Sequence, residues 1–104
     1  MKDDRVMGFA WYDRDSFEAL RARMPDMSES YEDWLLGAKK DLQRAVGEGY
    51  RVIRIALRPQ EFFPWCDRKG IGLPGLNARR SYAAEQATLL VKAERAGRGI
   101  LGLF

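Results

Sequence analysis

The sequence contains no histidine and only one cysteine, Cys66, in 104 residues. A single cysteine excludes a disulfide within the chain, and the lack of histidine excludes Ser/His and Cys/His catalysis together with the usual zinc ligand sets. No apolar stretch approaches the ~20 residues that cross a membrane, and the charged start of the chain does not resemble a signal peptide. We therefore expect a cytoplasmic, non-enzymatic protein that binds no cofactor, no metal and no membrane.

The composition is that of a folded domain, with 46% hydrophobic, 12% aromatic and 32% charged residues. We expect residues 1–104 to form a single domain. The net charge of +3 is unevenly distributed, because residues 1–52 carry 9 Lys and Arg against 11 Asp and Glu, whereas residues 53–104 carry 9 against 4. The basic C-terminal half could therefore meet an acidic partner, although a patch that only aids solubility is the alternative.

Two segments have the pattern of β-strands. Residues 5–12 alternate, with Met7, Phe9 and Trp11 on one face and the small Gly8 and Ala10 on the other. Residues 50–58 are rich in β-branched side chains, and their apolar face comprises Ile53, Ile55 and Leu57. We expect both apolar faces to point into the helices, which leaves a floor of small residues on the opposite face of a two-stranded sheet.

Helical spacing predicts four helices. They cover residues 13–24, residues 28–46 or 30–46, residues 59–69 and residues 77–96. The predicted caps are Asp15 or Ser16, Ser28 or Ser30, and Asn77. Pro64 lies inside the third helix, where its missing N–H costs a hydrogen bond unless the helix begins later or kinks. The predicted class is α+β in the order βααβαα, and the apolar tail 97–104 either docks on the body or frays.

The floor of small residues is the feature of the predicted sheet that suggests an interface. It could receive a helix, a second subunit or a nucleic-acid strand, and a covering helix from the same chain, most simply the last one, is the favoured alternative. The strand over residues 5–12 also has an apolar edge without proline or an internal charge. Edge pairing into a homodimer is therefore a second prediction.

Four short motifs have a recognisable pattern, namely Tyr31-Glu32-Asp33-Trp34-Leu35, Gly49-Tyr50-Arg51-Val52-Ile53-Arg54-Ile55, Phe62-x-x-Trp65-Cys66 and Ala78-Arg79-x-x-Tyr82-Ala83. Together they resemble a group of small bacterial proteins of unknown function. The resemblance covers residues 6–90 and implies one domain, but it implies no activity. Pro64 departs from the small, helix-favouring residue that is typical of the group.

Several residues have both a chemical and a structural interpretation. Cys66 lies beside cationic residues, but its apolar neighbours favour packing in the core. The carboxylate pairs Asp13/Asp15 and Glu32/Asp33 stand where helix starts favour negative charge, and the glycine-rich loop 70–75 lacks a phosphate-binding signature. Arg79 and Arg80 oppose the dipole at the start of the last helix, which an internal carboxylate, or else an acidic partner, would relieve.

By exclusion, we expect a small non-enzymatic binding or regulatory protein that acts through protein contacts, with an unknown partner that includes a second copy of itself. The alternative is a nucleic-acid-binding protein that uses arginine for phosphate contacts and tyrosine for stacking. Its candidate residues are Arg51, Arg54, Arg58, Arg79, Arg80, Tyr50 and Tyr82. An enzyme that works through carboxylates or Cys66 is the third alternative.

Overall fold

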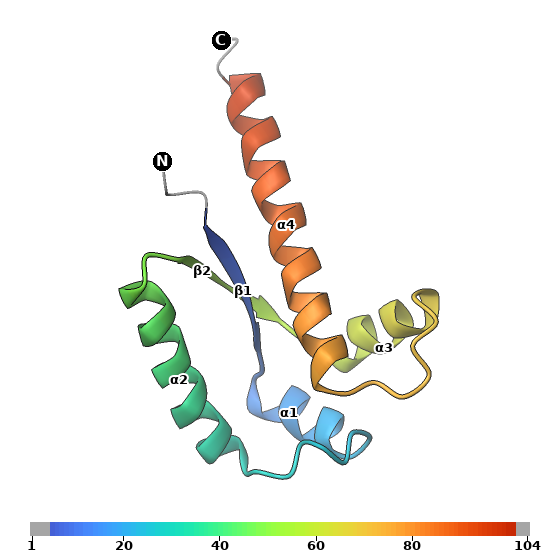
Figure 1. The fold of residues 1–104 in the computed structure, drawn as a ribbon. Helices are drawn as coiled ribbons and strands as arrows, with labels where there is room; N and C mark the ends of the chain where they lie inside the picture. The colour runs from blue at the N-terminus through green and yellow to red at the C-terminus, as the bar shows by residue number, and fades with distance from the viewer. Residues whose placement is uncertain (1–4, 102–104) are drawn as a thin grey trace.

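Six elements follow one another in the computed structural model, which describes the backbone of residues 5–101 and the side chains of residues 5–97 (Figure 1). They are β1 (Val6–Trp11), α1 (Arg14–Arg21), α2 (Tyr31–Gly47), β2 (Arg51–Ala56), α3 (Pro59–Arg68) and α4 (Leu76–Leu101). The predicted α+β class and the order βααβαα are confirmed.

The two strands form a parallel sheet, because α1 and α2 carry the chain back to the end of the sheet where β1 begins. The register pairs Gly8 with Ile53 and Phe9 with Arg54. Paired residues of a parallel ladder share a face, so Phe9 lies on the side of Arg54, and Ile53 lies on the side of Gly8. The prediction that the apolar faces of both strands coincide was therefore wrong. Alternation fixes the faces within each strand, but the register between strands depends on packing.

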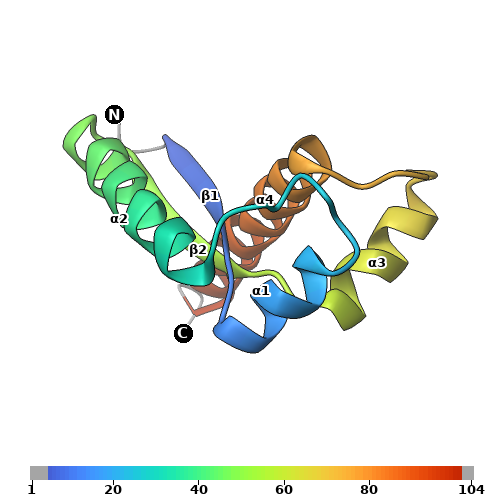
Figure 2. The same ribbon diagram turned by 90° about the horizontal axis from the view of Figure 1, so that it is seen from below.

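Helices cover both faces of this sheet, with α4 on one and α2 on the other (Figure 2). At Gly8, a Cβ atom would lie 2.4 Å from the carbonyl oxygen of Ala83 and 2.8 Å from Cβ of Ala87, both in α4. On the opposite face, the rings of Trp11 and Trp34 are 5.3 Å apart. The last helix thus covers the small residues of β1, as the favoured alternative predicted, but that face also carries Ile53 and Ile55 of β2.

Two groups of aromatic rings anchor the body of the protein. Tyr12, Phe17 and Trp34 meet where β1 passes into α1 and α2, with Tyr12 and Trp34 ring centres 4.7 Å apart. Trp65 and Tyr82 pack edge to face between α3 and α4, with ring centres 5.3 Å apart. Together with the buried aliphatic side chains, these rings hold α1, α3 and the first half of α4 in one core.

The helix boundaries differ from the predicted ones at the caps. The α1 cap is Asp13 rather than Asp15 or Ser16, since the Asp13 carboxylate accepts a hydrogen bond from the Ser16 N–H at 2.7 Å. Ser30 caps α2, which was one of the two predicted caps. Leu76 begins α4 one residue ahead of the predicted cap Asn77.

The third and fourth helices are continuous where the sequence suggested interruptions. α3 runs from Pro59 through Pro64 to Arg68, so the proline costs one backbone bond without ending the helix. Residues 97–101 of the expected apolar tail continue α4, while residues 102–104 lie outside the described part of the chain.

Candidate binding groove

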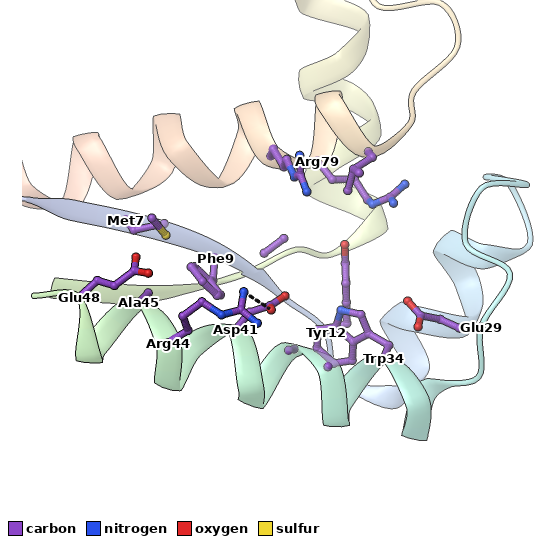
Figure 3. Close-up of a pocket in the computed structure, with 16 residues that line it drawn as sticks. Met7, Phe9, Tyr12, Glu29, Trp34, Asp41, Arg44, Ala45, Glu48 and Arg79 are labelled. Atoms are coloured by element: carbon purple, nitrogen blue, oxygen red, sulfur yellow. Dashed lines mark hydrogen bonds and ion pairs between the residues drawn. The ribbon is translucent and has the colours of Figure 1, made fainter. Parts of the chain in front are cut away.

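A groove of about 720 Å³ lies between α2, β1 and the start of α4 (Figure 3). Glu48 and Met7 stand at one end, and Tyr12, Trp34 and Arg79 stand at the other (Figure 3). The residues from α2 that line it are Trp34, Gly37, Ala38, Asp41, Arg44 and Ala45, with Glu48 just after the helix, and those from α4 are Leu76, Arg79 and Arg80. β1 contributes residues 7–10.

The free edge of β1 faces away from β2 and contributes backbone to this groove. Backbone bonds from Arg51 N to Arg5 O (2.8 Å) and from Leu57 N to Trp11 O (3.0 Å) show that odd-numbered residues of β1 bond to β2. Because successive residues point in opposite directions, the N–H and C=O groups of Gly8 and Ala10 point the other way. Within residues 5–101, no hydrogen bond from another element reaches these groups.

Three of the α2 residues that line the groove are small. Gly37, Ala38 and Ala45 all line it, and a Cβ added at Gly37 would meet no atom within 4 Å. A glycine in the middle of a helix costs roughly 0.5–1 kcal/mol relative to alanine. No neighbouring atom forces a glycine at position 37. The absence of a side chain there therefore leaves open space in the groove.

A buried arginine closes the end of the groove near Tyr12. The Arg79 side chain is only 8% exposed, and its Nη1 donates to Asp26 Oδ1 at 3.1 Å and to Met24 Sδ at 3.4 Å. The Arg79 hydrogen bond holds the pKa of Asp26 below its usual range. Burial raises the pKa of the Tyr12 hydroxyl, against the effect of the neighbouring guanidinium. An internal carboxylate thus relieves the charge of Arg79, as predicted.

The remaining charges of the groove separate into paired and unpaired groups. Asp41 and Arg44 form an ion pair of 3.3 Å along α2 (Figure 3). Glu29 precedes the cap of α2, where the helix dipole favours a negative charge. Glu48 and Arg80 are exposed, and neither side chain forms an ion pair with any residue whose side chain the structure describes.

The candidate nucleic-acid residues do not form one surface. Arg51 makes two hydrogen bonds of 2.8 and 2.7 Å to Glu94, on the α4 side of the sheet. Arg54 lies on the α2 side, 5.2 Å from the Trp11 ring.

The other candidates are dispersed as well. Arg58 pairs with Glu61 at 3.4 Å, Tyr50 lies beneath the Arg5 guanidinium, and Tyr82 is buried beside Trp65. Of the seven residues, the groove brings together only Arg79 and Arg80.

The candidate catalytic residues have structural surroundings. Cys66 is 1% exposed, and burial raises the pKa of its thiol. Asp13 caps α1, and Glu32 pairs with Arg14. In the part of the chain that the structure describes, no three Cys, Asp or Glu side chains gather in a way that could hold a metal ion.

Sequence reasoning did not find the groove or its two unpaired charges. Two local signals accompany them, namely Gly37 in the middle of α2 and Glu48 at the C-terminal end of that helix. Both are unfavourable for an isolated helix. A residue that is unfavourable for its own helix marks a candidate functional position. The sequence does not show which other residues lie beside it, because that depends on the folded chain.

Comparisons of this chain with known protein families, with curated proteins and with solved structures find no match. The resemblance to a group of small bacterial proteins therefore stays a prediction. No helix within residues 5–101 has the length and apolar character needed to cross a membrane.

Proposed function

We propose that this protein is a binding module that takes up an extended segment of another protein along the free edge of β1, between α2 and α4. The observation that carries the proposal is the position of that edge, which lines a groove of about 720 Å³. Peptides that add a strand to an open sheet edge gain affinity from main-chain hydrogen bonds and specificity from pockets for alternate side chains.

The sheet itself supports a strand as the ligand. Two strands make a marginal sheet, and a third strand would bond to the outward N–H and C=O groups of Gly8 and Ala10. The side chains of such a strand would point alternately toward α2 and α4. Those on the α2 side would meet Trp34 and the space above Gly37, which suits apolar side chains.

Helix packing favours a separate peptide over a second copy of the chain. A two-fold pairing of two β1 edges would place both α4 helices on the same face of one continuous sheet. Because α4 packs directly on β1 at Gly8, the two helices would lie over neighbouring strands, about 5 Å apart. Packed helices need roughly 8–10 Å between axes, so the pair would collide.

Selection from a random peptide display library, followed by binding measurements on the isolated peptides, tests the proposal. Gly37→Leu adds an apolar side chain to the groove at a position where a Cβ meets no atom within 4 Å, and Gly97→Leu is the matched control at a helical glycine with the same open space around its Cβ. We expect selected peptides to lose binding to Gly37→Leu and to keep it with Gly97→Leu. Bound peptide should also slow the amide exchange of Gly8 and Ala10.

Peptides that bind Gly37→Leu as well as they bind the wild type would contradict the proposal. A library that yields no binder to the wild-type chain would contradict it equally. A third outcome is that Gly37→Leu abolishes binding while bound peptide leaves the amide exchange of Gly8 and Ala10 unchanged. The groove would then be the binding site, but the peptide would not add as a strand.

A further inference from the structure

The two unpaired charges of the groove define the chemistry of the segment that fits it. Resting on the proposed function, we infer that the partner segment is an extended strand with a basic side chain opposite Glu48 and an acidic side chain opposite Arg80, five residues apart. Glu48 and Arg80 line the same groove but come from different helical regions, one at the end of α2 and one near the start of α4.

Glu48 is placed against the helix dipole. It is the C-terminal cap residue of α2, where the partial negative charge of the helix end disfavours a carboxylate. Lysine or arginine would be the stabilising choice at this position. Glu48 stands at the same end of the groove as Met7 (Figure 3), so a cation bound at that end would satisfy the carboxylate.

Arg80 stands near the start of α4 without a carboxylate partner among the residues whose side chains the structure describes. It is the fifth residue of α4, a helix whose first turn contains no acidic residue. Asp26 compensates the preceding Arg79 but forms no ion pair with Arg80. An acidic group in the groove would therefore supply the charge that the chain itself does not provide there.

Each of the other charged side chains that line the groove has an ion pair or a favourable position within the chain. Asp41 pairs with Arg44, Arg79 pairs with Asp26, and Glu29 stands before the positive end of α2. Glu48 and Arg80 remain as the two charges whose placement the fold does not explain. Their opposite signs within one groove complement a segment that carries both a basic and an acidic side chain.

The geometry of a strand sets the spacing of the two charges. The groove follows β1 from Met7, beside Glu48, to Tyr12 at the end where α4 begins. Five residues of a strand span roughly 16 Å at about 3.3 Å per residue. Glu48 belongs to the α2 side and Arg80 to the α4 side, so the two partner residues must point to opposite faces, which requires an odd separation. A segment that runs parallel to β1 then has a basic residue, four intervening residues and an acidic residue, in that order.

Two capped peptides test the inference. Acetylated and amidated Lys-Ser-Val-Thr-Val-Glu carries the expected order, with both valines toward α2, and Glu-Ser-Val-Thr-Val-Lys carries the charges exchanged. We expect the wild-type protein to bind the first roughly tenfold more tightly, because the exchanged peptide meets a repulsion at each end when it runs parallel to β1 and turns both valines away from α2 when it runs antiparallel. The preference should weaken as the salt concentration rises.

The double variant Glu48→Lys/Arg80→Glu should reverse the preference, so that the exchanged peptide binds more tightly. Both substitutions agree with the helix dipoles, and we expect the variant to melt no lower than the wild type. Glu29→Gln is the matched control. It removes a charge that lines the same groove but is already favoured by the dipole of α2, so this variant should keep the wild-type preference between the two peptides.

The results separate this inference from the proposed function. If both peptides bind equally and Gly37→Leu abolishes both, the groove takes up a strand but the charge rule is wrong. A double variant that keeps the wild-type preference would also overturn the charge rule. If neither peptide binds the wild type while peptides from the library do, the charge rule is again wrong. If no peptide of any kind binds, both the charge rule and the proposed function are wrong.

Discussion

The same substitution, glycine to alanine, should have opposite effects at Gly8 and Gly37. At Gly8 the new Cβ would lie 2.4 Å from the Ala83 carbonyl oxygen, about 1 Å inside ordinary van der Waals contact at 3.4 Å or more. The atom that it meets belongs to the backbone of α4, so relief requires a shift of the whole helix relative to β1. At Gly37 the new Cβ would meet nothing within 4 Å.

Overpacking costs typically 1–3 kcal/mol, and contact with a helix backbone places Gly8→Ala near the upper end, at about 3 kcal/mol. Gly37→Ala should instead stabilise the protein by roughly 0.5–1 kcal/mol, because alanine restricts the unfolded chain and favours the helix. For a domain of this size, 1 kcal/mol corresponds to about 4–8 °C in Tm. We therefore expect Gly8→Ala to melt roughly 12–24 °C below the wild type.

Thermal and denaturant unfolding, followed by circular dichroism of the helices, measure both variants against the wild type. The two changes are chemically identical, so their difference isolates the local packing. A Gly8→Ala protein as stable as the wild type would refute the close approach of α4 to β1. A Gly37→Ala protein of lower stability would refute the account of the groove as open space beside α2.

Three further outcomes follow from the core and from the ion pair at the end of the groove. Asp26→Asn should lose about 1–2 kcal/mol at pH 7, because it leaves the buried Arg79 without its counter-charge, while the 43% exposure of the Asp26 side chain lets solvent screen part of the pair. Since the folded pKa of Asp26 is depressed, its contribution is present above the unfolded pKa of about 3.9 and is lost as the pH falls through the lower folded value. Unfolding midpoints at pH 7 and pH 3 should therefore differ less in the variant than in the wild type, and an equal difference would contradict this pairing. Cys66 should react slowly with a thiol reagent in the folded protein and rapidly in denaturant, as its burial and raised pKa require, and equal rates would argue against a buried thiol. Trp65→Ala should cost about 3–5 kcal/mol, whereas Trp34→Ala should cost less because that ring is only half-buried, and chemical denaturation of both variants decides the order.

The order of the elements is a property that the sequence determines by itself. Alternation over β1, the helical spacing of α2 and the cap at Ser30 are relations between residues close in the chain, and they predicted these elements at nearly their observed bounds. The burial of Cys66 followed similarly from its apolar neighbours. The expectation that a carboxylate of the chain relieves Arg79 was also correct, but the sequence did not identify Asp26 as that carboxylate.

Only the tertiary structure decided the pairing of the strands, and with it the groove. Local alternation cannot distinguish whether Ile53 lies across from Phe9 or from Gly8, because a shift of one residue exchanges the faces without changing either strand. The close fit of α4 on Gly8 selects the register and leaves the opposite edge of β1 open toward α2. Glu48 and Arg80 are separated by 32 positions in the sequence, and they line one groove only because both helices pack against the same small sheet.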